Sequence, residues 1–132
     1  MEIHFRVNEK VTAQAVIEVF KSSGINRLID DVKRMQAILD NSNLIITAWN
    51  GTELIGIARA LTDFNYCCYL SDLAIKKEHQ KLGIGKTLIE LTQETIGEQT
   101  MLLLLSSNPA MEYYPKIGFE KVGNGFIIKR KA

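Results

Sequence analysis

The stretch Gln80-Lys81-Leu82-Gly83-Ile84-Gly85 stands between an apolar, strand-like segment and an amphipathic segment with helical spacing. Glycine lets the backbone adopt positive φ angles and approach a ligand closely. A helix that begins beside such a loop directs unpaired N–H groups and the positive end of its dipole toward an anion. The stretch therefore has the parts of a phosphate-binding loop, and a nucleotide-containing ligand is the first hypothesis.

The segments around this loop predict alternating strands and helices. Strand-like patterns cover residues 3–7, 44–49, 53–60, 66–75 and 101–105, and Asn50-Gly51 is a strong hairpin signal between the second and third. The continuous apolar run at 101–105 predicts a strand buried on both faces. Helical spacing covers residues 12–24, 31–39, 84–96 and 109–118. Thr12 can cap the first of these helices and Gly24 can end it, and Asp30-Asp31 opens the second. Two short strands at 120–122 and 126–129 would complete the sheet.

This order predicts an α+β fold with three-layer character. The strand–helix–strand connection from residue 69 to residue 105 predicts one parallel, right-handed crossover, and the other strand pairs are expected to be antiparallel. At 132 residues the chain is long enough for one domain with its own core. We therefore expect a single domain over residues 1–132, with a mixed, mostly antiparallel sheet of six to seven strands and about four helices.

Composition excludes several classes of partner and site. The chain has 16 Lys and Arg against 15 Asp and Glu, so no strong field attracts nucleic acid or an anionic membrane. Cys67 and Cys68 are neighbours in a strand-like segment, so we expect reduced core thiols rather than a disulfide, and no metal site. The first residues turn polar too early for a signal peptide, and the longest apolar run is too short to span a membrane. A cytoplasmic location is expected.

Spacing separates three kinds of nucleotide-binding loop. A dinucleotide-binding G-x-G-x-x-G motif needs a third small residue where this chain has Leu88. The segment Gly85-Lys86-Thr87 matches the end of a P-loop, but the first glycine of that motif falls on Gln80 and the next strand ends without a magnesium-binding aspartate. The pattern Q/R-x-x-G-x-G/A, in contrast, matches Gln80, Gly83 and Gly85.

With this loop pattern, the sequence resembles the GNAT superfamily, the acyl-CoA-dependent N-acyltransferases. A second segment, AMEYYPKIGF at residues 110–119, is similar to another signature of that family, a short helix with a tyrosine that ends in Gly-Phe. The motifs cover residues 69–119, and the order of elements matches over nearly the whole chain. The resemblance implies the GNAT fold, in which the parallel strands at 66–75 and 101–105 splay apart.

The resemblance also implies acetyl-CoA as the acyl donor, with no metal. Loop N–H groups would wrap the pyrophosphate, Gln80 would orient the loop by hydrogen bonds, and backbone groups of Leu73 and Ile75 would pair with the pantetheine arm. An N–H near Leu73 would polarise the thioester carbonyl. Asn108 would bind the pantetheine amide, or else cap the helix at Pro109. The predicted cofactor-binding residues are Leu73, Ala74, Ile75, Gln80, Lys81, Leu82, Gly83, Ile84, Gly85, Lys86, Thr87 and Asn108.

The resemblance implies Tyr114 as the residue that protonates the departing thiolate, with a core packing role as the alternative. Tyr113 is the tyrosine expected in the core. The general base stays open, because Asp72 could be a structural hydrogen-bond acceptor and a water relay could remove the proton. His79 is expected to be a solvated loop residue.

Acceptor contacts are less well specified by the sequence. The substrate-binding candidates are Ser71, Asp72 and Arg59, and further possible contacts are Arg27, Asp30, Trp49 and Asp63. The predicted function is transfer of an acetyl group from acetyl-CoA to a primary amine of a small molecule by direct attack in a ternary complex. A protein or peptide acceptor, a non-catalytic acyl-CoA sensor and an ATP-binding module are the alternatives. Exposed terminal strands leave a homodimer open.

Overall fold

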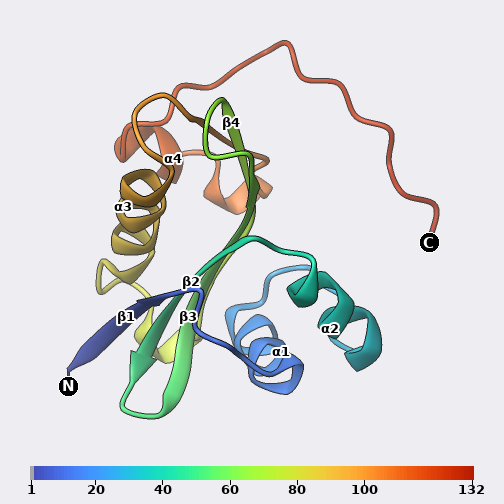
Figure 1. Ribbon diagram of the computed structural model, residues 1–132, viewed down its shortest axis with the longest axis vertical. Coiled ribbons are helices and arrows are strands. Elements are labelled where there is room, and N and C mark those ends of the chain that lie inside the picture. The colour runs from blue at the N-terminus through green and yellow to red at the C-terminus, as the bar shows by residue number, and fades with distance from the viewer. Residues whose placement is uncertain (1) are drawn as a thin grey trace.

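A five-stranded mixed sheet forms the centre of the computed structural model, which describes residues 2–132 (Figure 1). The strand order β1-β2-β3-β4-β5 follows the chain. The first four strands, β1 (Ile3–Val7), β2 (Leu44–Asn50), β3 (Glu53–Thr62) and β4 (Cys67–Ile75), pair in antiparallel fashion. The last strand, β5 (Met101–Leu104), runs parallel to β4, as the sequence predicts.

The hairpin between β2 and β3 forms where Asn50-Gly51 predicts it. Asn50 pairs with Glu53, and Gly51 has a φ angle of 61°, a conformation that costs glycine no steric strain. Both strands lie inside the sheet, and most of their side chains are buried on both faces.

The helices begin and end at the predicted capping residues. Thr12 accepts a hydrogen bond from the N–H of Ala15 at the start of α1 (Ala13–Ser23), and Asp31 accepts one from Arg34 at the start of α2 (Val32–Asp40). Gly24 ends α1 in the left-handed conformation. The remaining helical segments are η1 (Lys77–His79), α3 (Ile84–Ile96), η2 (Asn108–Ala110) and α4 (Tyr113–Lys116).

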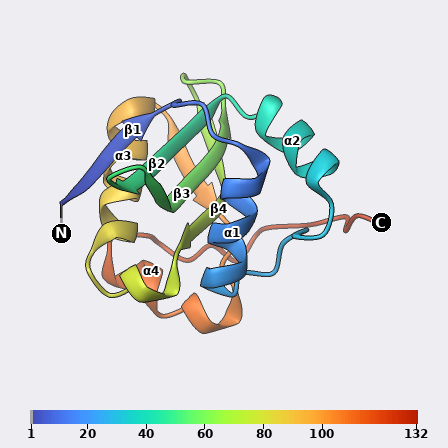
Figure 2. The ribbon, with the colours of Figure 1, turned by 90° about the horizontal axis from the view of Figure 1, so that it is seen from below.

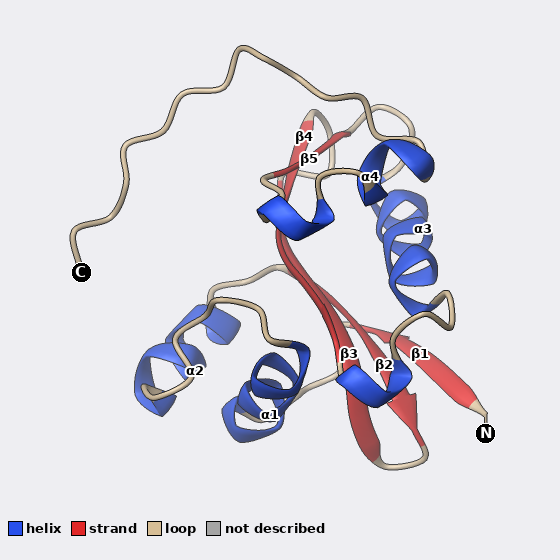
Figure 3. Cartoon of the chain, turned by 180° about the vertical axis from the view of Figure 1, so that it is seen from behind, coloured by secondary structure: helices blue, strands red, loops and turns tan. Residues whose placement is uncertain are grey.

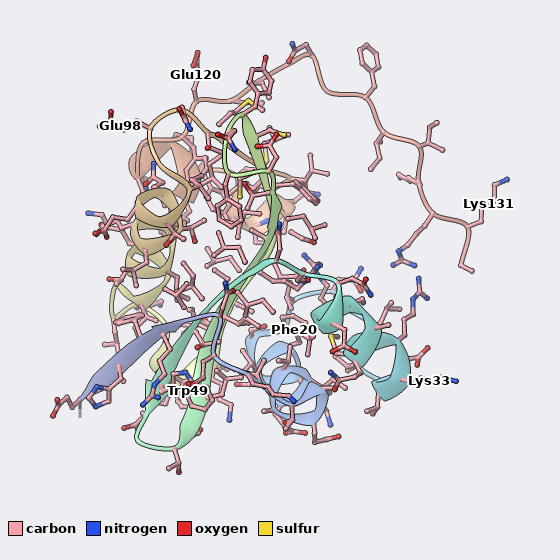
Figure 4. The ribbon with its side chains drawn as sticks, viewed as in Figure 1. Phe20, Lys33, Trp49, Glu98, Glu120 and Lys131 are labelled. Carbon is pink, nitrogen blue, oxygen red and sulfur yellow. The ribbon has the colours of Figure 1, made fainter. Side chains whose placement is uncertain are left out.

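Two apolar clusters, one on each face of the sheet, make the fold three-layered (Figure 3). One cluster joins the sheet to α3 through residues such as Leu88 and Ile89. The other joins it to α1 and α2 through Phe20 and Met35, and Figure 4 shows Phe20 on α1. Alternate residues of β2 therefore serve different clusters, with Ile46 on the α3 side and Ile45 on the α1 side.

A β-bulge interrupts β4 at Ser71. Arg59 of β3 is opposite Asp72 while Ala60 is opposite Leu70, so Ser71 is an extra residue on β4. The bulge breaks the alternation of side chains, because Leu70 packs in the α3 cluster whereas Ala74, four residues later, packs in the α1 cluster. Asp72 consequently lies on the side of the sheet from which the α1–α2 connection approaches.

The structure corrects the C-terminal part of the predicted sheet. Residues 119–132 contain neither helix nor strand, so the predicted strands at 120–122 and 126–129 are wrong, and the described sheet has five strands rather than six or seven. Figures 1 and 2 show this segment as an extended trace that leaves the sheet. Phe126 and Ile128 are almost fully exposed, at 100% and 97%. A strand forms only where its backbone finds a partner, which β propensity alone does not guarantee.

The absence of the two predicted terminal strands also accounts for the exposure of β5. The sequence predicts a strand buried on both faces, yet Met101 and Leu103 are exposed and only the alternate residues pack against the α3 cluster. β5 is the edge strand of the described sheet, so no further strand lies beside it among residues 2–132. Cys68 is buried and Cys67 is exposed, both as free thiols, so only one is in the core. No helix within residues 2–132 is long and apolar enough to cross a membrane.

Candidate active site

A cleft of about 1240 Å³ opens where β4 and β5 separate. Its walls come from the second half of β4, the loop before α3, the end of β5, the α4 region and the α1–α2 connection. Segments far apart in the sequence therefore meet in one place. The cleft includes most of the residues that the sequence singles out.

The free edge of β4 forms one wall of this cleft. Pairing between β4 and β5 ends at Leu70 and Leu104, immediately before the bulge at Ser71. The N–H of Lys76 donates to Ile55 of β3 at 2.8 Å, so the backbone groups of Ile75 point the other way. By the same alternation Leu73 directs its N–H and C=O into the cleft. This edge can accept an extended ligand as an added strand.

The glycine loop brings the start of α3 to the same cleft. Gly83 precedes the helix with a φ of 80°, and Lys81 also adopts a positive φ of 66°. The first N–H groups of any helix have no acceptor within the helix. Together with the helix dipole they make a cradle that fits a phosphate group. The side-chain amide of Gln80 donates to the carbonyl of Ile75 at 2.9 Å and so ties the loop to β4, as the sequence predicts.

Gly85 lies against the side chains that form the floor of the cleft. A Cβ atom at this position would lie 3.7 Å from the hydroxyl of Tyr113 and 4.0 Å from Cδ2 of Leu73. Neither distance is a clash. A glycine here keeps the helix N-terminus open to a ligand, and any larger side chain would project into that space.

The predicted cofactor residues divide into two groups. Those on the cleft wall are Leu73, Ala74, Ile75, Gln80, Lys81, Gly83, Ile84 and Gly85. Those outside the lining are Leu82, Lys86, Thr87 and Asn108. In the second group the hydroxyl of Thr87 donates back to the carbonyl of Gly83, and exposed Lys86 lies 4.0 Å from Glu90. Asn108 is exposed at the start of η2 and makes no side-chain cap there.

The two tyrosines of α4 both line the cleft, but their surroundings differ from those expected. Tyr114 packs against the α3 cluster, and its ring lies edge-on to Phe119 with the centroids 5.4 Å apart. Tyr113 is 40% exposed, so the prediction that it is the core tyrosine is wrong. Burial, with a smaller effect of Tyr113, raises the pKa of Tyr114, and the charge of Arg27 partly offsets this. The Tyr114 hydroxyl therefore stays protonated at neutral pH.

Asp72 is the centre of a network between three parts of the chain. Its carboxylate is only 2% exposed, and its two oxygens bind Arg27 of the α1–α2 connection and Arg59 of β3. The guanidinium of Arg27 also donates to the carbonyl of Ser71 at 2.8 Å, and that of Arg59 to the hydroxyl of Ser71 at 2.8 Å and of Ser42 at 3.0 Å.

The network contains all three substrate-binding candidates and shows where they lie. Ser71, Asp72 and Arg59 lie together on the cleft wall, as does Arg27. Asp72 is a hydrogen-bond acceptor held by two cations rather than a carboxylate that faces the cleft. Trp49 instead donates to Thr47. Asp63 accepts from the N–H groups of residues 65–67 in the β3–β4 turn, and neither Trp49 nor Asp63 is among the residues that line the cleft.

His79 is a site residue that sequence reasoning missed. The imidazole is only 7% exposed and lines the cleft beside the glycine loop, which contradicts the prediction of a solvated loop residue. Its Nδ1 atom is buried and has no hydrogen-bond partner among the described residues. A buried polar atom of this kind normally has a partner, and a water molecule enclosed in the protein is the expected one. The surrounding Lys-Lys-Glu sequence gave no signal of burial.

Comparison with known proteins agrees with this geometry. The family model described as "Acetyltransferase (GNAT) domain" matches residues 5–129, so the chain belongs to the GNAT acetyltransferase family. An uncharacterized N-acetyltransferase, ycf52 of Pyropia yezoensis, is 30% identical over 71% of this chain and 58% of its own length. A histone acetyltransferase, TAP1 of Glycine max, is 30% identical over 88% of this chain and 62% of its own length. The chain thus spans about three fifths of these relatives.

Solved structures share the fold over nearly the whole chain. A GNAT family protein, SP0256 of Streptococcus pneumoniae, has a TM-score of 0.77 at 20% identity, covering 99% of this chain and 100% of its own. Aminoglycoside N-acetyltransferase AAC(6')-Iy in complex with CoA has a TM-score of 0.74 at 16% identity, covering 99% of this chain and 96% of its own. At these identities the likeness concerns the fold alone.

Proposed function

We propose that this protein is an N-acetyltransferase that transfers an acetyl group from acetyl-CoA to the primary amine of a small molecule in a ternary complex. One observation carries the proposal: the free edge of β4 beyond Leu70 and the glycine loop at the start of α3 line the same cleft. The first suits an extended amide-containing arm and the second suits a pyrophosphate. Membership of the GNAT acetyltransferase family supports the same donor.

The residues that would hold acetyl-CoA follow from these two features. The backbone of Leu73 and the N–H of Ile75 would pair with the pantetheine arm, and the N–H groups from Gly83 onward would bind the pyrophosphate, with Lys81 adding charge. When bound, acetyl-CoA supplies the acetyl group as a thioester, whose transfer to an amine forms an amide and releases the CoA thiol.

Leu73 and Tyr114 would serve the chemistry from opposite sides of the cleft. The N–H of Leu73 would donate to the oxygen on which negative charge develops. Tyr114 would donate its phenolic proton to the sulfur. A phenol with a pKa near 10 is a weaker acid than a thiol near 8.5, which costs about 2 kcal/mol. Burial of Tyr114 adds to this cost, so the proton transfer has to rely on a well-positioned hydrogen bond.

A protein amine is the second acceptor class, and the relative from Glycine max named a histone acetyltransferase favours it. The charge of the cleft weighs against a lysine-rich segment. Arg27, Arg59 and Lys81 line it, and Asp72 is already bound by the two arginines. Like charges oppose the approach of a polycationic chain. We therefore place the small-molecule acceptor first.

Thermal-shift measurements with CoA, acetyl-CoA and ATP–magnesium test the donor. Acetyl-CoA and CoA should raise the melting temperature and ATP–magnesium should not, since a ligand that binds only the folded state stabilises it. Stabilisation by ATP–magnesium alone would refute the proposal. Release of free thiol in the presence of amines then separates an enzyme from a sensor, because a sensor is stabilised by acetyl-CoA without releasing thiol.

Replacing Tyr114 with Phe tests the proton donor. We expect kcat to fall about tenfold or more while the acetyl-CoA-induced thermal shift is kept, because the hydroxyl acts mainly in the transition state. The decline of activity in alkaline solution should lie above the ordinary tyrosine pKa and disappear in the variant. Tyr113→Phe is the matched control, with a similar volume change on the same helix. An unchanged rate across pH in Tyr114→Phe would remove Tyr114 from this role.

A further inference from the structure

The wall of the cleft carries an excess of positive charge. The described lining residues include Arg27, Arg34, Arg59, Lys81 and Arg130, whereas Asp72 is the only carboxylate among them. Within the network two guanidinium groups surround that single carboxylate, which leaves one positive charge uncompensated. This charge lies between β3, β4 and the α1–α2 connection, opposite the glycine loop that suits a phosphate.

Arg27 is the member of the network that a ligand can reach. Its side chain is 33% exposed, whereas Arg59 is 12% exposed and Asp72 is 2% exposed. Arg27 donates to Asp72, to the carbonyl of Ser71 and to the carbonyl of Asn26, which accounts for one N–H on each of its three nitrogens. A guanidinium group has five N–H donors, so two of them stay available.

We propose that the acceptor is a small amine that also carries a carboxylate, in the simplest case a free amino acid, and that Arg27 binds this carboxylate. This inference rests on the proposed acetyltransferase function and adds the chemical class of its acceptor. A guanidinium group matches a carboxylate better than any other cation does, because two of its N–H groups can donate in parallel. Asp72 and Arg59 act as positioning residues, since they fix the orientation of Arg27.

The position of Arg27 suits this role. Arg27 and Tyr114 both line the cleft, so an acceptor bound at Arg27 lies in the same cavity as the proposed proton donor. A carboxylate bound at Arg27 would hold the amine of the same molecule near the point where β4 loses its pairing with β5. The uncompensated charge would also repel acceptors with several positive charges. The cleft therefore selects for an anionic group on the acceptor as well as for an amine.

A matched pair of acceptors tests the inference on the unmodified protein. Thiol release from acetyl-CoA is measured with a panel of amino acids, with the corresponding amino acid amides and with a polyamine. We expect at least one amino acid to exceed its amide by about tenfold or more in kcat/KM, the range for a hydrogen bond to a charged group. The amide has the less basic amine and more of the reactive neutral form, so this preference would run against intrinsic reactivity.

Variants of Arg27 test whether this residue causes the preference for amino acids over their amides. Arg27→Gln should reduce the acid-to-amide ratio to near one, Arg27→Lys should restore part of it, and the thermal shift with acetyl-CoA should persist in both. The control is Lys33→Gln, which removes a positive charge from an exposed position on α2 outside the cleft (Figure 4) and should leave the ratio unchanged.

The outcomes separate this inference from the proposed function. Equal or faster reaction of amides, the polyamine or peptide amines would overturn the carboxylate preference and leave the acetyltransferase intact. An acid preference that survives in Arg27→Gln would overturn the role of Arg27. Failure of every amine to release thiol, despite a thermal shift with acetyl-CoA, would overturn the proposed function itself.

Discussion

Replacing Asp72 with Asn is the sharpest test of how the cleft is built. The substitution keeps the size of the side chain but removes its charge, which leaves the guanidinium groups of Arg27 and Arg59 without the carboxylate that they share, a group that is only 2% exposed. Removing one partner of a buried ion pair costs about 3 to 5 kcal/mol. Because Arg27 is one-third exposed and can turn toward water, we expect the lower end, about 3 kcal/mol.

That loss is large for a domain of this size. Total stabilities run at about 5 to 15 kcal/mol, and about 3 kcal/mol corresponds to a fall in melting temperature on the order of 10 °C. Urea unfolding followed by circular dichroism measures the free energy of unfolding, with Asp30→Asn as the matched control. Asp30 is an exposed aspartate just before α2, and its substitution should change the free energy by less than about 0.5 kcal/mol.

A second substitution distinguishes charge from packing. If repulsion between the two arginines causes the loss, then adding Arg27→Gln to Asp72→Asn should recover about 1 kcal/mol relative to the sum of the single changes. A loss below about 1 kcal/mol for Asp72→Asn would refute the view that this carboxylate holds the two arginines in place. Strict additivity of the two changes would refute the electrostatic reasoning while leaving a packing role for the side chain.

Three further predictions concern other parts of the structure. Gly83→Ala should lower stability by about 1 kcal/mol and weaken the thermal shift with CoA, because alanine is strained at the positive φ before α3; Gly123→Ala, without a positive φ, should do neither. Asp63→Asn should lower the melting temperature at neutral pH, because three backbone N–H groups bind the carboxylate and lower its pKa to about 2. The charged form favours folding, so the difference between wild type and variant should shrink as pH falls from about 4 through 2. His79→Phe keeps a ring in the wall of the cleft and removes the unpaired Nδ1 atom, so it should change the melting temperature of the free protein by no more than a few degrees; a larger fall would show that Nδ1 has a hydrogen-bond partner inside the protein.

Local patterns predicted most of the sheet and helices. The Asn50-Gly51 turn, the capping residues Thr12 and Asp31 and the glycine loop each depend on backbone conformations that a few residues determine. The prediction of the two terminal strands was wrong for the opposite reason. Residues 126–129 have the composition of a strand, but strand formation depends on a pairing edge elsewhere in the molecule. The exposure of β5 followed from the same missing partner.

The parts of the candidate site that are formed by the backbone of one continuous segment could be predicted from the sequence. The parts formed by side chains from distant segments could not. The glycine loop was predictable because a strand, a loop and a helix follow one another there, and the resemblance to the GNAT family pointed to the strand that contains Leu73. The sequence could not show that Arg27, which lies 45 residues before Asp72, and Arg59 would both bind the carboxylate of Asp72. The sequence also predicted Tyr113 as the core tyrosine, whereas Tyr114 packs against the core. A helix of four residues has no periodicity that would identify its inward face.

The bulge at Ser71 has a consequence for how such a cleft can arise. Pairing with β5 stops at Leu70, and from the next residue onward the strand offers its backbone to a ligand instead. β4 therefore pairs with β3 on both sides of the bulge, whereas its other edge is paired with β5 before the bulge and free after it. A sheet can acquire a ligand site in this way without a new loop or a new domain, by giving up one interstrand contact where a single residue has been inserted.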